Sequence, residues 1–327
     1  MCTNLTRQIL SVDLSSLQKA QALLEAGCFV GVPTETVYGL AADATNGKAV
    51  ARIFEAKGRP QFNPLICHVS SLDMAQAFAQ FNDNACALAG AFWPGPLTLV
   101  LPLKENSAIH PLVTAGLNTV AVRFPRGPMA NLIAAFGKPL AAPSANASGK
   151  ISPTTAKAVL DSLGDKVDLI LDGGACAVGL ESTIVKVDGD RLILLRPGSV
   201  TLAEIEKVAQ MNVSSVQKDA TIQAPGMLAS HYAPNAIMRL DVSSVMTDEA
   251  FLAFGPIDPE VSKNALVIEN LSASGDLIEA AANLFSMMSK LDQSGALSIA
   301  VAPIPMEGIG IAINDRLARA AAPRELL

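Results

Sequence analysis

The sequence predicts an α/β fold divided into two domains. The chain has 327 residues, of which half are hydrophobic and only 17% are charged. Short apolar runs alternate with segments of helical periodicity along most of its length. Because a single core stops growing efficiently beyond about 250 residues, a chain of this length favours two domains. Its aliphatic composition excludes a largely disordered protein.

The first domain is predicted to be a sheet covered by helices. A helix is expected at 13–26, where the apolar spacing is helical and Gly27 supplies a stop signal. A short strand at 28–32 ends at Pro33. Further helices are expected at 46–57, 71–80, 83–91, 128–136 and 154–162, and further strands at 65–69, 97–101, 119–124, 140–142, 168–171, 183–187 and 191–195.

A second, smaller α/β unit follows a linker. Periodicity fades over 212–235, a polar segment that contains Pro and Gly and has the composition of an interdomain connection. The expected domains are therefore 1–211 and 236–327. In the second domain, strands are expected at 237–242, 250–255, 265–270 and 297–302, and helices at 275–292 and 310–321.

Charge is distributed unevenly between the two ends of the chain. Residues 1–210 carry 17 Lys and Arg against 17 Asp and Glu, whereas 211–327 carry 7 against 13, which gives the net charge of −6. The sequence pI of about 5.2 argues against a broad nucleic-acid surface, which is normally basic. Any RNA contact is expected to be weak or local.

The sequence predicts a cytoplasmic protein with no membrane partner. Residues 1–12 contain no apolar run of signal-peptide length, and the longest uncharged stretch, 84–103, is interrupted at Pro94 and Pro96. The five cysteines are odd in number and have no CxxC spacing, so they indicate neither a disulfide framework nor a zinc site.

Polar residues of the first domain gather in turns next to predicted strands, where open α/β sheets usually bind ligands. These turns are PTETVYG (33–39), KGRPQFNPL (57–65), RFPRG (123–127), SANASG (144–149), ESTI (181–184) and RPG (196–198). They bring Lys57, Arg59, Arg123 and Arg196 beside Ser and Thr hydroxyls, a combination that favours recognition of anions. A P-loop motif is absent, and the scattered histidines indicate no catalytic triad.

The order and the amino-acid sequences of these fragments resemble those of a known family. PTETVYGL, KGRPxxNPL, WPGPLTLVL, VAVRFP, APSANASG and LESTIV are similar to the YrdC-type domain of threonylcarbamoyl-AMP synthases. The linker APGMLASHYAP and the tail GIGIAINDRLARAA resemble the long, two-domain form. The resemblance implies a YrdC-like twisted open sheet with helices, followed by a Rossmann-like C-terminal α/β domain. It also implies synthesis of threonylcarbamoyl-AMP and pyrophosphate from L-threonine, bicarbonate and ATP, for the threonylcarbamoyladenosine modification of tRNA.

The resemblance also implies a set of site residues. Lys57 and Arg59 would act on the phosphates as the catalytic residues. ATP would be held by these two and by Asn63, Thr119, Ser144, Asn146, Ser152, Arg196 and Tyr232, and L-threonine by Thr34, His68, Arg123 and Ser182. Mg²⁺ would accompany ATP, although no carboxylate pair identifies its ligands. The commoner TSAN is PSAN here, so Pro143 is outside any claim of side-chain contact.

The linker is expected to form a lid around Tyr232, because exclusion of water protects a labile carbamate. The alternative is an ordered strap without ligand contact. Two further functions compete with the synthase: a carbamoyl-adenylating protein of the hydrogenase-maturation type, whose acylphosphatase segment and Cys-rich motifs are not visible, and a double-stranded RNA-binding or ribosome-associated module, which the acidic pI disfavours. A synthase would hand its product to the tRNA threonylcarbamoyl transferase complex.

Overall fold

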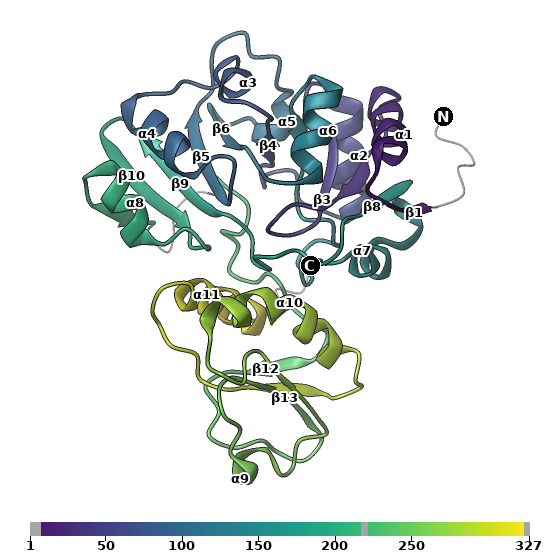
Figure 1. Cartoon of the computed structure of the whole chain (residues 1–327), viewed down its shortest axis with the longest axis vertical. Helices are drawn as coiled ribbons and strands as arrows, with labels where there is room; N and C mark the ends of the chain where they lie inside the picture. The colour runs from purple at the N-terminus through teal and green to yellow at the C-terminus, as the bar shows by residue number, and fades with distance from the viewer. Residues whose placement is uncertain (1–7, 217–221, 324–327) are drawn as a thin grey trace. The chain divides into compact units, whose positions relative to one another are not determined.

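The computed structural model describes residues 8–216 and 222–323, which divide into two compact units (Figure 1). Unit 1 takes the described residues of 8–148, 153–176 and 181–227, and unit 2 takes 149–152, 177–180 and 228–323. The expected linker at 212–235 is thus shared, since it passes from unit 1 to unit 2 after Met227. Its stretch 217–221 lies outside the described residues.

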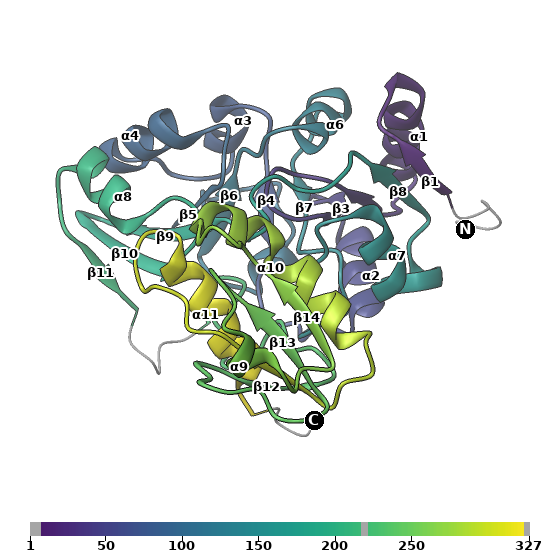
Figure 2. The same ribbon diagram turned by 60° about the horizontal axis from the view of Figure 1, so that its bottom comes forward.

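Unit 1 is built on a mixed sheet with eleven strands. In spatial order they are β1 (Gln8–Ser11), β8 (Leu169–Asp172), β2 (Val30–Val32), β3 (Gly39–Asp43), β7 (Leu140–Ala141), β4 (Ile66–His68), β6 (Thr119–Arg123), β5 (Leu97–Pro102), β9 (Thr183–Asp188), β10 (Arg191–Arg196) and β11 (Val213–Ser215). Figure 2 shows the two ends of this series, β1 with β8 at one end and β10 with β11 at the other.

Helices cover both faces of this sheet. They are α1 (Leu14–Glu25), α2 (Gly47–Lys57), α3 (Leu72–Gln76), α4 (Asp83–Phe92), α5 (Pro111–Thr114), α6 (Pro128–Phe136), α7 (Ala156–Leu163) and α8 (Leu202–Ala209). Successive side chains of β3 point to opposite faces of the sheet and so enter two different hydrophobic cores. Leu40 packs with α2 on one face, whereas Ala41 packs with α1 and α6 on the other. The larger core lies on the α2 side and contains Ile53 and Phe54.

Helix ends follow the capping signals in the sequence. Asp13 and Ser16 form a reciprocal capping box at the start of α1, and Gly27, at a φ of +74°, follows its end. Helix α2 ends at Lys57, because Gly58 adopts the left-handed conformation with a φ of +59°. This end places Lys57 beside the turn that follows β7.

Unit 2 has a four-stranded sheet in which every pair is parallel. The strands, in order, are β12 (Ile237–Arg239), β15 (Ser298–Val301), β13 (Glu249–Ala253) and β14 (Val267–Asn270). Helices α10 (Leu277–Asp292) and α11 (Gly310–Ala321) lie on one side of it, and α9 (Pro259–Ser262) lies on the other (Figure 1). The Arg239 guanidinium binds Glu249 at 2.6 and 2.8 Å and lowers the pKa of that carboxyl to about 2.

Some elements differ from the sequence prediction. Strand β3 was not predicted, because its residues GLAAD are small and lack the β-branched signal, although all five are buried in the sheet. Helix α8 was also missed, although Thr201 and Glu204 form a capping box at its start. The segment expected to be linker begins with strand β11, which pairs in parallel with β10.

One cysteine contradicts the prediction that the chain has no disulfide. Cys67, Cys86 and Cys176 are free thiols, whereas Cys28 takes part in a disulfide. An odd number of cysteines does not prevent one pair from forming, so the count was a poor guide. Among residues 8–216 and 222–323, no helix is long and apolar enough to cross a membrane.

Candidate active site

Lys57 holds the turn that contains Ser144 and Asn146. Its ammonium donates to the backbone carbonyl of Ser144 at 2.5 Å and to that of Asn146, and the carbonyl of Lys57 accepts from the Ser148 amide at 2.8 Å. Burial and the positive charge of Arg59 lower the pKa of Lys57 well below its usual value. The structure therefore brings three of the predicted ATP residues together, with Lys57 contacting backbone atoms of the other two.

Arg59 shapes the neighbouring loop in the same way. Its guanidinium donates to the backbone carbonyls of Asn63 at 3.2 Å and Pro64 at 2.9 Å, and it is 92% buried. The side chain of Asn63 is also buried, and its Oδ1 atom has no hydrogen-bond partner among the described residues. A buried acceptor of this kind is costly unless a ligand or water supplies a donor.

Strand alternation places Thr119 and Arg123 on the same face of β6. They are four positions apart, which corresponds to about 13 Å along the strand. Arg123 lies opposite His68 of the adjacent parallel strand β4. The predicted threonine residues Arg123 and His68 are therefore neighbours at one end of these strands, whereas Thr119, a predicted ATP residue, lies at the other end of β6.

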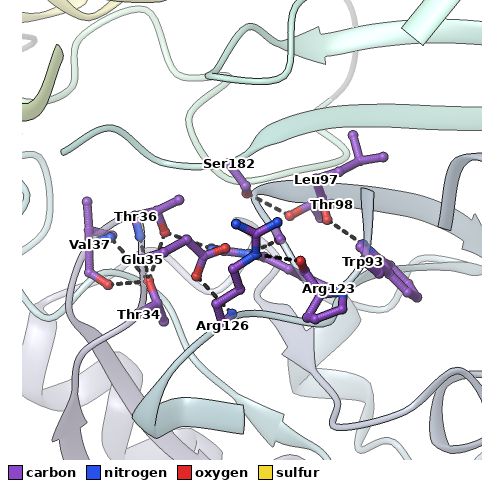
Figure 3. Close-up of polar contacts among 12 residues, drawn as sticks. Thr34, Glu35, Thr36, Val37, Trp93, Leu97, Thr98, Arg123, Arg126 and Ser182 are labelled. Carbon is purple, nitrogen blue, oxygen red and sulfur yellow. Dashed lines mark hydrogen bonds and ion pairs between the residues drawn. The ribbon is translucent and has the colours of Figure 1, made fainter. Parts of the chain in front are cut away.

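Arg123 is buried in a network that joins three segments (Figure 3). Its guanidinium donates to the Thr36 hydroxyl at 2.8 Å and to the Gly95 carbonyl at 3.1 Å. Its remaining terminal nitrogen lies 2.7 Å from Glu35 Oε1. The other Glu35 oxygen accepts from the Arg126 amide at 3.0 Å, which fastens the PTET turn to the residues that follow β6.

Thr34 organises the turn that carries Glu35. Its hydroxyl donates to the Val37 carbonyl at 2.7 Å and accepts from the Thr36 and Val37 amides at 3.1 and 3.2 Å (Figure 3). This is a hydroxyl-stabilised turn, so the side chain has a local structural role as well as a predicted ligand role.

Ser182 and Arg196 meet on the other side of Arg123. The Ser182 hydroxyl lies 2.7 Å from that of Thr98. Arg196 donates to the Ser182 carbonyl at 3.0 and 3.1 Å and to the Pro225 carbonyl at 3.3 Å. A predicted ATP residue thus directly contacts a predicted threonine residue and also anchors the part of the linker that belongs to unit 1.

A bulge in β10 directs Arg196 toward this group. The β9–β10 register shifts between Leu194 and Arg196, so that Arg196 lies opposite Ile184. By strict alternation Arg196 would share a face with Leu192 and Leu194, which pack with the main core. Leu195 remains with the apolar residues on the site side of the sheet.

That apolar cluster lies on the face that carries Thr119 and Arg123. Its strand residues are Ile66, Val100, Ala121, Ile184, Ile193 and Leu195. In the described part of the chain, the residues that complete it are Val216, Ala224 and Met227, all from the expected linker. These three residues therefore pack on the sheet between the two polar ends of the predicted site.

His68 is held as a neutral imidazole. Burial and the charge of Arg123 lower the pKa of His68 to about 3. Its Nδ1 atom lies 3.3 Å from the Ile66 carbonyl, which can only accept, so Nδ1 carries the proton and Nε2 is an acceptor. The site therefore offers a neutral acceptor beside the Arg123 cation.

This shift predicts a pH-dependent stability. Below the ordinary pKa of 6.5 the unfolded chain binds a proton at His68 and the folded chain does not. Stability should therefore fall by about 1.4 kcal/mol per pH unit as the pH decreases from 6.5 toward 3. Urea unfolding of the wild type and His68→Asn, followed by fluorescence of Trp93, the only tryptophan, measures this loss. Parallel pH profiles for the two proteins would contradict it.

Ser152 and Tyr232, the two remaining predicted ATP residues, belong to unit 2 and are buried there. The Tyr232 ring packs against Phe285, with ring centroids 5.5 Å apart. Its backbone has a φ of +63°, a conformation that is uncommon for a residue other than glycine. The other predicted ATP residues belong to unit 1, so the predicted set is divided between the two units.

Sequence reasoning missed Glu35, Thr36, Thr98 and Arg126. Glu35 could have been predicted, because a carboxylate in one of the polar turns is a suitable ion-pair partner for a buried arginine such as Arg123. Thr98 gave none, since it lies in an apolar strand and its contact with Ser182 depends on the pairing of β5 with β9.

The described residues contain no group of three or more His, Cys, Asp or Glu side chains placed to hold a metal ion. A Mg²⁺ ion bound with ATP needs few protein ligands, because phosphate oxygens and water fill most of its octahedral shell.

Two family models match the chain. The Sua5, YciO and YrdC model, described as "Telomere recombination", matches residues 22–198, and the model described as "Threonylcarbamoyl-AMP synthase, C-terminal domain" matches 200–322. The threonylcarbamoyl-AMP synthase of Pyrococcus abyssi is 39% identical over 93% of this chain and 94% of the relative. That of Bacillus subtilis is 38% identical over 96% and 95% of the two chains.

Solved structures agree with the sequence relatives. P. abyssi Sua5 complexed with L-threonine has a TM-score of 0.85 and 36% identity, and the match covers 97% of this chain and 98% of that one. A variant of P. abyssi Sua5 in which an adjacent histidine and tyrosine are replaced by alanine has a TM-score of 0.84 and 35% identity, with 97% and 96% covered. The twisted α/β sheet, the second α/β domain and nearly full-length identity together show that the chain belongs to the threonylcarbamoyl-AMP synthase family, in its two-domain form.

Proposed function

We propose that this enzyme joins L-threonine, bicarbonate and ATP into threonylcarbamoyl-AMP and releases pyrophosphate. One observation carries the proposal: the buried cluster of Arg123, His68 and Ser182 occurs in a chain that matches a threonine-bound relative over almost its whole length. The cluster offers a cation, a neutral acceptor and a hydroxyl, which suit the carboxylate, the hydroxyl and the amine of threonine.

Arg123 is the proposed clamp for the threonine carboxylate. Each edge of its guanidinium already has a partner, namely Gly95, Thr36 or Glu35. We therefore propose that the incoming carboxylate takes over part of the ion pair with Glu35. Thr34 supports this step indirectly, because its hydroxyl holds the turn from which Glu35 projects.

We propose that ATP binds along the face of the sheet that carries Thr119 and Arg123. Asn63 supplies a buried amide oxygen that can accept from an adenine amino group or a ribose hydroxyl. Thr119, Ser144, Asn146, Ser152 and Arg196 are proposed to complete it. Lys57 and Arg59 first shape two loops through backbone carbonyls, and we propose that their positive charges stabilise the phosphates as negative charge develops.

The proposed reaction proceeds in two balanced steps. The neutral threonine amine adds to CO₂ derived from bicarbonate and loses a proton, which forms a carbamate. A carbamate oxygen then attacks the α-phosphorus of ATP. The bond between the α-phosphorus and the oxygen that joins it to the β-phosphorus breaks, and pyrophosphate leaves. Lys57 and Arg59 would stabilise negative charge at the phosphates. Mg²⁺ is proposed to enter with ATP, and no step is assigned to it.

The linker is proposed to act as a lid during this reaction, with Tyr232 contributing to ATP binding. Val216, Ala224 and Met227 of the linker already pack on the site face of unit 1. A closed lid would exclude water from the carbamate and the adenylate. We further propose that the reaction takes place in the cytoplasm and that the product passes to the transferase complex that modifies tRNA.

The test is amino-acid selectivity. The enzyme is incubated with ATP, bicarbonate and either threonine, serine or valine, and pyrophosphate and the adenylate product are measured. Valine should react at least about 100-fold less efficiently than threonine, because it leaves a buried polar partner of the hydroxyl unsatisfied. Serine, which lacks one methyl group, should lose only about 10-fold to 100-fold.

The control omits bicarbonate, which should abolish threonine-dependent pyrophosphate release. Equal rates with all three amino acids would contradict the proposed threonine pocket. Undiminished release after removal of bicarbonate would contradict the carbamate step.

A further inference from the structure

Helix α11 of unit 2 carries a fully buried arginine. Arg316 has no exposed surface and is the largest fully buried side chain among the described residues. Its Nη1 atom lies 2.7 Å from Asp315. A buried cation of this kind is expensive to maintain unless its surroundings use the charge. It belongs to the tail motif NDRLARAA, for which the proposed reaction has no role.

The aromatic partner of Arg316 is Tyr232. The guanidinium carbon lies 5.4 Å from the centre of the tyrosine ring, within the range of a cation–π contact. His231 packs against the ring with a centroid distance of 4.1 Å, and Phe285 contacts it as well. These contacts hold Tyr232 at its positive φ, which the backbone alone would disfavour.

Arg319 fastens the backbone that precedes Tyr232 at two points. We call Leu228–Pro234 the strap. Arg319 Nη1 donates to the Leu228 carbonyl at 2.6 Å, and the Arg319 carbonyl accepts from the His231 amide at 3.1 Å. Asp315 lies 2.7 Å from Arg316 and 3.0 Å from Arg319. One turn of α11 therefore holds both the side chain and the backbone of the strap.

The strap is also tied to the loop that leaves the SANASG motif. The Ala233 amide donates to the Gly149 carbonyl at 2.8 Å, and Lys150 donates to Asn235 at 2.7 Å. Gly149 lies only three residues after Asn146 in the chain. The strap is therefore hydrogen-bonded to a loop that follows Asn146, a proposed ATP residue, directly in the chain.

We propose that Arg316 is a positioning residue, through which the C-terminal domain fixes Tyr232 and the strap in the pose required for adenylation. Asp315 and Arg319 complete this lock. The inference rests on the proposed function for its catalytic consequence, but the lock itself is independent of the reaction. Arginine suits the position because its planar cation can face a ring and bind a carboxylate at the same time.

The test compares Arg316→Met and Arg316→Lys with Lys263→Met. The control breaks an exposed ion pair of the same unit, Lys263–Glu260, at the end of α9. Hydrogen exchange at the His231 and Ala233 amides should be at least 10-fold faster in Arg316→Met than in the wild type, should change less in Arg316→Lys and should be unchanged in Lys263→Met. The adenylate formed per pyrophosphate released should fall at least 3-fold in Arg316→Met and stay at the wild-type value in the control.

Each outcome decides the inference. Unchanged exchange at the two amides in both Arg316 variants would overturn the lock, and faster exchange with an unchanged product ratio would overturn the positioning role. If Arg316→Met does not fold, Arg316→Lys provides both readouts. Failure of the wild type to release pyrophosphate with threonine would instead refute the proposed function and leave the exchange result to decide the lock.

Discussion

Replacing Arg123 with methionine is expected to destabilise unit 1 by about 3 to 5 kcal/mol. The substitution leaves Glu35 without its cation, and that side chain is only 11% exposed. The free energy of unfolding can be measured in urea through the fluorescence of Trp93, which lies in the same unit. Arg191→Met is the control, because its pair with Asp188 is largely exposed and should contribute less than about 1 kcal/mol.

The double variant Glu35→Gln/Arg123→Met separates stability from activity. It removes the stranded charge and should recover most of the stability lost in the single variant. Threonine-dependent pyrophosphate release should nevertheless remain at least about 100-fold below wild type in kcat/KM, because the carboxylate clamp is absent. A stable double variant with normal kcat/KM would exclude Arg123 from the threonine site.

Two truncations, one before the linker and one within it, are expected to differ in the stability of unit 1. A chain that ends at Gln210 lacks Val216, Ala224 and Met227 and leaves the apolar cluster uncovered. A chain that ends at Met227 keeps these residues. The shorter form should unfold at lower urea concentration and expose apolar surface to a hydrophobic dye, whereas the longer form should remain compact.

Both truncations should form at least about 100-fold less threonylcarbamoyl-AMP than the full chain, because both lack the strap and the domain that holds it. Tyr232→Ala in the full chain should lower the product formed per pyrophosphate released. The measurement is the amount of threonylcarbamoyl-AMP formed per pyrophosphate released by the full chain, the two truncations and Tyr232→Ala. Identical rates and ratios would show that the linker is only a tether.

The sequence was sufficient for the fold where local signals agreed with the final structure. Helix α1 has a capping box and a glycine stop, and β6 is an apolar run that is buried as a strand. Strand β3 could not be predicted, because Gly and Ala become strand residues there only through pairing with β2 and β7. Tertiary pairing, which no short window contains, decided that element.

The sequence named candidate site residues but did not predict how they are arranged. His68 and Arg123 are 55 positions apart in the sequence and become neighbours through the register of β4 and β6. Lys57 was expected to face phosphate, but its hydrogen bonds to the Ser144 and Asn146 carbonyls depend on where α2 ends relative to the turn after β7. Distances of this kind arise from packing and cannot be obtained from motif spacing.

The bulge in β10 allows consecutive residues to serve the same face of the sheet. In a regular strand, only every second residue can reach a given ligand, so an apolar contact and a charge need separate positions two residues apart. Here Leu195 fills the apolar cluster and Arg196, the next residue, reaches Ser182. Deletion of one residue at the bulge would leave either the apolar contact of Leu195 or the Arg196 contact with Ser182, but not both. Insertion of one residue before Leu194 would turn the side chains at the C-terminal end of β10 to the opposite face of the sheet.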